Sequence, residues 1–223
     1  MRGRLCLSKA MVEIQTEVGA RWLGLNVSHD AHWDIDAGQH FPVIRSNSSA
    51  GRHLDLMRWG IIAAWLNDTM VISTTVDCHA EICETALRYD RPWSVTRRCL
   101  IPSDGLYEWR TDDHQSLALA SADRRLMTLG GIWEQHMSPA GNCLSCFAIL
   151  VAETNGAVAQ ICRQTPVVIP LEARREWLGE ETSNSERIMK LLVPYPSEKL
   201  IIGPLNHGHK VRKTDTVSNS QLL

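Results

Sequence analysis

The segment from Thr96 to Trp109, which reads TRRCLIPSDGLYEW, contains the residue best suited to proton transfer. A Ser-Asp-Gly turn at residues 103–105 interrupts it, and Glu108 follows between Tyr107 and Trp109. A carboxylate held between two aromatic side chains after a tight turn is partly removed from water, which raises its pKa toward the range useful for acid–base catalysis. Glu108 is therefore the candidate acid or base. A surface glutamate on an edge strand is the alternative that the residues leave open.

A second pattern has the residue types of a zinc site. His79-Ala80-Glu81, followed by Cys143-Leu144-Ser145-Cys146, resembles the zinc deaminase signature, in which a His and two Cys hold the metal and the Glu moves protons. Asn142 replaces the proline of that signature, and the second half runs into the apolar stretch 147–151, which is typical of a strand where that fold needs a helix. Four unconnected residues are the better interpretation, so we predict no metal and no other cofactor.

Short strands must position these residues. Apolar or alternating runs predict strands over 53–62, 115–121, 125–133, 144–152, 166–170 and 199–202. The turn Ala122-Asp123-Arg124 predicts that the second and third of these strands form a hairpin.

Helices are fewer. The patterns predict them over 11–19, 172–178 and 187–192, the last preceded by the capping-box pattern Ser183-Asn184-Ser185-Glu186 and followed by Pro194. Strands outnumber helices without regular βαβ alternation, which predicts a single α+β domain built on mostly antiparallel sheet.

The charge balance limits the possible partners. Of 223 residues, 23 are Lys or Arg and 25 are Asp or Glu, so the formal net charge is −2. This excludes a protein that coats duplex DNA by bulk electrostatics, but it allows a local basic groove. The apolar stretches are far shorter than the ~20 residues of a membrane span, and no apolar run opens the chain. We therefore expect a cytoplasmic protein without membrane association, whose seven cysteines are reduced.

The 96–109 segment resembles the RRCLIPADGFYEW signature of the SOS-response-associated peptidase family, the abasic-site-processing proteins of bacteria and eukaryotes. Further matches follow in order along the chain: 41–45 resembles VPVIR, 57–65 resembles MRWGLIPxW, 130–134 looks like AGLWE, 165–169 looks like MPVIL, and Leu205-Asn206 stands where the family has Val-Asn. The resemblance implies a barrel-like domain over residues 1–210, followed by a tail over 211–223.

The resemblance also implies an activity. In that family the initiator Met is removed, and the N-terminal Cys attacks the ring-opened aldehyde of an abasic site in single-stranded DNA. Amine and thiol together form a thiazolidine, a stable DNA–protein crosslink. Carried over to this chain, Glu108 aids proton transfer, Gly3 and Arg4 remain from the family's MCGR start with Arg4 contacting phosphate, and Trp65 stacks against a base.

Several of the family's chemical residues are replaced. Arg2 occupies the position of the nucleophilic Cys, Asp77 and His79 stand where the NARAET motif has Asn and Arg, and Cys162 stands where the IHxRMP motif has His. The YNIAPTQ motif has become WDIDAGQ over 33–39. Whether the chain still acts as an enzyme is therefore open.

These replacements have chemical consequences. Arginine at position 2 is too bulky for ordinary Met removal, so we expect an N-terminal Met1 whose α-amine, with a pKa near 7.7–8.0, can form only a reversible Schiff base with an aldehyde. Negative charge at Asp77 and a neutral His79 should weaken DNA binding by about 2–4 kcal/mol. The expected partner is single-stranded DNA with an abasic site. The alternative is a non-catalytic protein that uses the same groove for another ligand or a protein partner.

Overall fold

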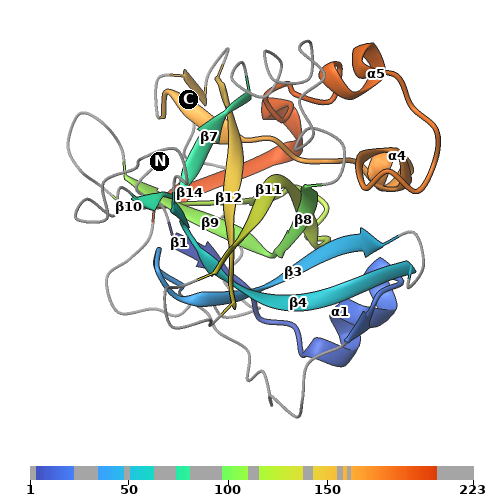
Figure 1. Ribbon diagram of the computed structural model, residues 1–223. Helices are drawn as coiled ribbons and strands as arrows, with labels where there is room; N and C mark the ends of the chain where they lie inside the picture. The colour runs from blue at the N-terminus through green and yellow to red at the C-terminus, as the bar shows by residue number, and fades with distance from the viewer. Residues whose placement is uncertain are drawn as a thin grey trace.

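Strands make up most of the architecture (Figure 1), which confirms the prediction of an α+β fold built on mostly antiparallel sheet. The computed structural model describes residues 4–22, 35–47, 51–62, 74–80, 97–109, 116–137, 143–154, 158–159 and 162–204. The strands are β1 (Arg4–Cys6), β2 (Arg21–Trp22), β3 (His40–Asn47), β4 (Gly51–Trp59), β5 (Ile61–Ile62), β6 (Thr74–Thr75), β7 (Asp77–His79), β8 (Arg98–Ser103), β9 (Gly105–Trp109), β10 (Ser116–Ser121), β11 (Met127–Met137), β12 (Cys143–Glu153), β13 (Gln164–Pro166) and β14 (Leu200–Pro204).

The helical elements are short. They are α1 (Met11–Val18), α4 (Arg174–Trp177), α5 (Ser185–Met189) and the 3₁₀ turns η2 (Leu171–Ala173) and η3 (Ser197–Lys199). None of the helices in the described ranges has the length and apolar character that a membrane crossing requires.

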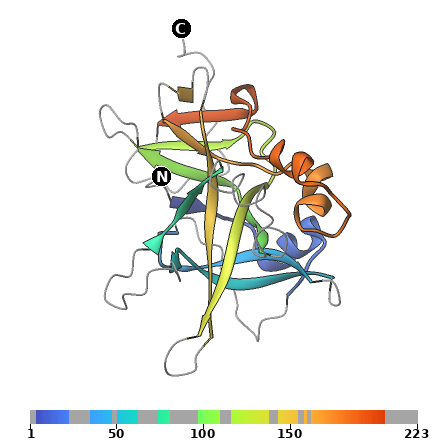
Figure 2. The same ribbon diagram turned by 45° about the horizontal axis from the view of Figure 1, so that its top comes forward.

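Five of the described strands close into a barrel in the order β12, β11, β8, β3 and β4, as the resemblance implied. Neighbours along this path pair antiparallel, and the ring closes because β12 also pairs with β4 in parallel, Cys146 opposite Arg58 and Phe147 opposite Trp59. The long strands β11 and β12 cross the molecule in both ribbon views (Figures 1 and 2). Closure satisfies the edge hydrogen bonds that an open sheet would leave unpaired.

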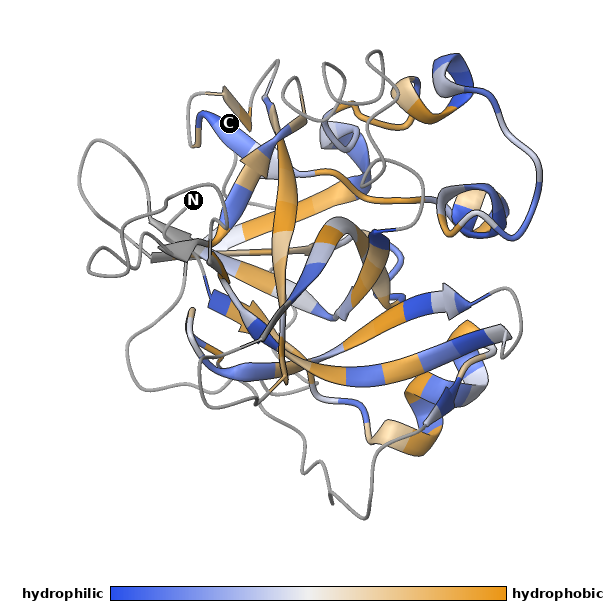
Figure 3. Cartoon of the chain, in the orientation of Figure 1, coloured by the Kyte–Doolittle hydropathy of each residue, from blue (hydrophilic) through white to orange (hydrophobic). Residues whose placement is uncertain are grey.

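Aromatic side chains fill the barrel. The ring of Trp59 stacks on the ring of Phe147, with centroids 6.4 Å apart. The ring centroid of Phe41 lies 6.5 Å from that of Phe147. The indole N–H of Trp59 donates to the carbonyl oxygen of Val76 at 2.9 Å, so the buried donor is satisfied. β12, which contributes Phe147, is coloured mainly as hydrophobic along its middle (Figure 3). The interior is therefore a packed core.

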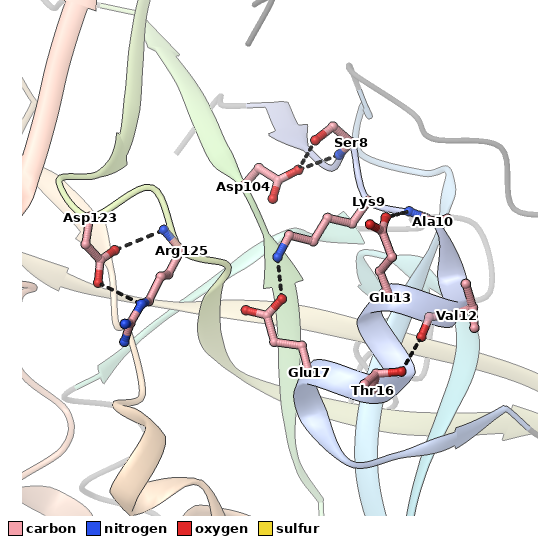
Figure 4. Close-up of polar contacts among 10 residues, drawn as sticks. All are labelled: Ser8, Lys9, Ala10, Val12, Glu13, Thr16, Glu17, Asp104, Asp123 and Arg125. Atoms are coloured by element: carbon pink, nitrogen blue, oxygen red, sulfur yellow. Dashed lines mark hydrogen bonds and ion pairs between the residues drawn. The ribbon is translucent and has the colours of Figure 1, made fainter.

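A second, four-stranded sheet has the order β1-β9-β10-β14. β8 belongs to the barrel and β9 to this sheet, so the predicted turn at 103–105 is the point where the chain passes from one to the other. Asp104 holds this point, because its carboxylate accepts from the backbone N–H and the hydroxyl of Ser8 at 2.5 and 2.6 Å (Figure 4). Gly105 is required here, since a Cβ would lie 2.8 Å from the carbonyl oxygen of Leu119 on β10.

The predicted hairpin of 115–121 with 125–133 is wrong, although both strands exist. β10 pairs with β9 and β14, whereas β11 pairs with β8 and β12. The intervening turn is real: Asp123 accepts from the hydroxyl of Ser121 at 2.7 Å. It also accepts from the N–H of Arg125 at 3.0 Å, as Figure 4 shows. Both hydrogen-bonding edges of β10 are already occupied, so the chain leaves the turn into the other sheet.

The remaining sequence predictions are correct to within a few residues. Helix α1 ends at Val18, followed by Gly19 in the left-handed region (φ 64°) that favours glycine. In α5 the N-cap is Asn184, whose side chain accepts from the N–H of Arg187 at 2.9 Å, and not Ser183, whose hydroxyl donates to Glu176. That helix ends at Met189, earlier than predicted. The strand predicted over 166–170 is shifted to β13, with residue 168 left in an isolated bridge.

Candidate functional site

Strand β9 places Glu108, the predicted acid or base, in the second sheet. Its backbone pairs with Leu117 of β10, and the preceding residue, Tyr107, pairs with Arg4 of β1. The start of the described chain therefore lies along the strand that carries Glu108. The Glu108 side chain, and the predicted DNA contacts Gly3 and Trp65, lie outside the described residues.

Arg4, the predicted phosphate contact, forms a two-pronged ion pair with Asp36. Its Nε donates to Oδ1 at 2.7 Å and its Nη2 donates to Oδ2 at 2.8 Å. The side chains retain 37% and 55% of their exposure, so the pair lies at the surface. Paired hydrogen bonds of this kind are the strongest geometry for an arginine and a carboxylate. The positive charge of Arg4 is thus matched by a negative charge in contact with it.

Strand β7 carries two of the replaced positions, Asp77 and His79, along the barrel strand β12. It pairs in parallel with β12, so that His79 lies opposite Val151. Strand β13 pairs with the same segment of β12, with Val151 opposite Pro166. The amide nitrogen of Gln164 on β13 lies 3.1 Å from Nδ1 of the exposed His79. The side chains of His79 and Gln164 are therefore in contact across the two strands.

Cys162 stands where the family has its catalytic histidine, and it is buried. Only 5% of the residue is exposed, and it packs in the main hydrophobic cluster. Its N–H donates to the carbonyl oxygen of Val158 at 2.9 Å, and its own carbonyl accepts from the hydroxyl of Thr154. A thiol in this position contributes to packing and is not presented to a substrate.

The zinc interpretation fails on geometry. Cys143 and Cys146 both lie on β12, three residues apart, so their side chains project from opposite faces of the strand. His79 lies opposite Val151, five residues beyond Cys146, which corresponds to about 17 Å along a strand. One ion cannot reach all three side chains. The described residues also contain no group of three or more metal-binding side chains, and Glu81 lies outside them.

Two residues of this region were missed by the sequence reasoning. Asp36 belongs to the altered YNIAPTQ motif, but it lies 32 positions from Arg4, so no local pattern indicated the ion pair. Arg58, in the segment that resembles MRWGLIPxW, lies near Gly38, where a Cβ would be 3.7 Å from its Nη2. Its recorded hydrogen bond is to the carbonyl oxygen of Gly60 at 3.5 Å, and within the described ranges no carboxylate lies at ion-pair distance from it.

Solved structures share this fold. A protein from Bacteroides thetaiotaomicron superposes with a TM-score of 0.77 at 20% sequence identity, covering 92% of each chain. A phage-related protein from Bordetella bronchiseptica superposes with a TM-score of 0.68 at 20% identity, covering 91% of this chain and 93% of that one.

The relatives that are similar in sequence include several abasic site processing proteins. The chain is 26% identical over 157 residues to the abasic site processing protein YoqW of Bacillus subtilis, covering 69% of this chain and 70% of the relative. It is 24% identical over 203 residues to the abasic site processing protein YoaM of the same organism, covering 90% and 88%. The mouse abasic site processing protein HMCES is 24% identical over 178 residues, and the match spans 50% of its length. A family model described as SOS response associated peptidase (SRAP) matches residues 1–210, and the chain belongs to that family.

Proposed function

We propose that this protein binds single-stranded DNA at abasic sites and forms at most a reversible covalent bond with the aldehyde there. Membership of the family over residues 1–210 supports a role in abasic site processing. One structural observation carries the chemical part: β1 pairs with β9, with Arg4 opposite Tyr107, so the start of the chain runs beside the strand of Glu108. The first described residue, three positions after Met1, therefore lies opposite the residue that precedes Glu108.

The covalent step uses the α-amine of Met1. The unprotonated amine adds to the aldehyde carbonyl of the ring-opened abasic site and gives a carbinolamine, which loses water to form a Schiff base. Glu108, in this proposal, donates the proton that leaves with the departing hydroxyl and accepts it back on hydrolysis. Residue 2 is arginine, so no thiol on the same residue closes a thiazolidine ring on the imine carbon. Water therefore reverses the reaction.

The noncovalent site is weakened in the same region. Arg4 is tied to Asp36, the imidazole of His79 is held by Gln164, and Cys162 is buried. Each change removes a cation or a proton donor that a family member would direct at the DNA. We therefore expect weak binding with a shallow salt dependence, because the slope of log affinity against log salt scales with the number of phosphate contacts.

The test is trapping on an oligonucleotide with one abasic site. The protein is incubated with it and analysed by denaturing electrophoresis, with and without borohydride, which reduces a Schiff base to a stable amine. We expect an adduct only with borohydride, and none with an oligonucleotide of the same sequence that lacks the lesion. Glu108→Gln should slow trapping by about 100-fold, because it removes the acid–base group.

A heat-stable adduct without borohydride would show that crosslinking is retained. No adduct and no binding of single-stranded DNA at low salt would instead support the second hypothesis, a non-catalytic protein with another ligand. The acidic partner of Arg4 is the observation that favours this second hypothesis.

A further inference from the structure

We propose that Asp36 sets the affinity of this protein for the DNA backbone, because it occupies the guanidinium of Arg4 in place of a phosphate. This inference rests on the proposed function and adds a residue that limits it. A carboxylate presents two oxygens in the planar arrangement with which a phosphate also engages an arginine. Asp36 therefore acts as a built-in competitor for the phosphate site.

The ion pair uses one whole edge of the guanidinium. Nε and Nη2 donate to the two different oxygens of Asp36, at 2.7 and 2.8 Å. A phosphate that approaches this edge must displace both hydrogen bonds at once and separate two charges in contact. Binding of DNA through Arg4 is therefore an exchange of one partner for another and not the addition of a new contact.

The backbone holds Asp36 in place for this contact. Leu5 and Ile35, the residues next to Arg4 and Asp36 in the sequence, are joined by two backbone hydrogen bonds, from Leu5 to Ile35 at 3.1 Å and from Ile35 to Leu5 at 2.9 Å. The N–H of Asp36 donates to the side chain of Gln39 at 2.8 Å, and the N–H of Gln39 donates to the carbonyl oxygen of Asp36 at 3.2 Å. Because the carboxylate is fixed beforehand, little conformational entropy is lost when the pair forms.

Two other ion pairs among the described residues have different surroundings. Arg52 and Glu180 each retain only 16% of their side-chain exposure and join distant segments. The pair of Arg125 and Asp123 is exposed at 81% and 58%, but its nitrogen and oxygen lie 3.8 Å apart, across a surface turn of the second sheet. It offers a matched control, because neutralising Asp123 changes the net charge by the same amount away from the proposed site.

The experiment measures binding of a fluorescent single-stranded oligonucleotide without a lesion, by anisotropy over a series of salt concentrations. We expect Asp36→Asn to bind about tenfold more tightly than the wild type, and the slope of log affinity against log salt to steepen by about 0.7, the value for one additional phosphate contact on single-stranded DNA. Asp123→Asn should leave both quantities unchanged. Asp36→Ala, which has the residue of the family motif, serves as a second variant if the asparagine variant does not fold.

Arg4→Gln completes a double-mutant cycle. It should abolish the gain in affinity that Asp36→Asn produces. A gain in affinity that persists without Arg4, or that Asp123→Asn reproduces, would overturn the inference. Equal binding by the wild type and Asp36→Asn would also overturn it, but would leave the proposed function standing. Binding by Asp36→Asn alone would support the inference. No binding by any variant at low salt would overturn both proposals.

Discussion

At single positions, the protein has replaced the reactive and cationic groups of its family with groups that are acidic, neutral or buried. Arg2 stands where the family's motif has Cys, and folding does not change this difference in side-chain chemistry. Cys162 is held in the core, and His79 is held by Gln164. Several positions of the family's motifs are therefore altered, and restoring one of them should not restore the family's full activity.

Arg2→Cys tests this expectation. The substitution restores the MCGR start, so the initiator Met should be removed, which the intact mass of the purified protein will show. We expect heat-stable crosslinking to an abasic-site oligonucleotide to appear but to remain slow, because the acid–base histidine and the phosphate-binding arginine of the family are still absent. The measurement is the rate of adduct formation on denaturing gels without borohydride.

Arg2→Ser is the matched control, because its small side chain also permits Met removal but supplies no thiol. It should give no heat-stable adduct. Rapid and complete crosslinking by Arg2→Cys would contradict the view that Asp77, His79 and Cys162 matter to the chemistry.

Among the elements, helix α4 contacts a buried arginine of the barrel strand β8. Arg98 of β8 is 7% exposed and donates from Nε to the carbonyl oxygen of Trp177 at the end of α4, and its guanidinium lies 5.5 Å from the Trp177 ring centroid. Burial lowers the pKa of Arg98 to about 10, and the nearby carboxylate of Glu176 partly opposes this. The indole of Trp177 in turn donates to the carbonyl oxygen of Cys99 at 2.8 Å.

Arg98→Ala should lower the free energy of unfolding by about 3 kcal/mol, because it removes a buried cation from beside Glu176 and leaves the carbonyl of Trp177 without that donor. Its sequence neighbour Arg97 is exposed, so Arg97→Ala should change stability by less than about 0.5 kcal/mol. Urea denaturation of the three proteins measures both values. Equal losses for the two variants would show that α4 is not joined to the barrel in this way.

The barrel strand β11 depends on a glycine for packing. A Cβ on Gly131 would lie 2.3 Å from Cδ1 of Ile101 and 2.9 Å from the carbonyl oxygen of Ala148, and the second of these atoms is backbone that cannot move aside. At the adjacent Gly130 the closest atom is the flexible end of Ile169, at 3.2 Å.

Gly131→Ala should therefore destabilise the protein by about 3 kcal/mol, at the upper end of the cost of overpacking a core. Gly130→Ala should cost about 1 kcal/mol or less, since Ile169 can shift by a few tenths of an ångström. Thermal unfolding followed by circular dichroism will rank the two variants. A larger loss of stability for Gly130→Ala than for Gly131→Ala would contradict the close contacts given for Gly131.

Over the whole molecule, Arg52 joins segments far apart in the chain. From β4 it donates through Nε and Nη2 to Glu180 at 2.9 and 2.6 Å, and through Nη1 to the carbonyl oxygen of Val18, the last residue of α1, at 2.6 Å. Helix α1, the barrel and the segment between α4 and α5 thus meet at one side chain. Because both partners are largely shielded from water, the pair is weakly screened.

Arg52→Ala should lower the free energy of unfolding by about 3 kcal/mol, because it leaves Glu180 shielded and unpaired and removes the donor to Val18. The exposed pair of Arg175 and Glu181 is the control, since Arg175→Ala should cost less than about 0.5 kcal/mol. Denaturant midpoints at low and high salt give the comparison. A loss for Arg52→Ala that disappears at high salt would indicate a screened surface pair instead.

Much of this molecule could be predicted from residue type and local pattern. Helix α1, the barrel strands β4, β11 and β12 and the turn at 103–105 depend on nearby residues, and the structure has them close to where they were predicted, whereas the barrel strands β3 and β8 were not predicted. The family followed from ordered motifs, and the missing nucleophile followed from the identity of residue 2. These features depend on residue identity or on neighbouring residues, so the sequence alone is enough to predict them.

Other features depended on which strands pair, and only the tertiary structure decided them. The strands over 115–121 and 125–133 lie in different sheets because β9 and β14 occupy both edges of β10. Arg4 meets Asp36, 32 positions away, and His79 meets Gln164, 85 positions away. Such contacts arise from long-range register, which local propensity does not encode. The sequence by itself determined where this chain departs from the family's motifs, and the fold decided which side chains those positions contact.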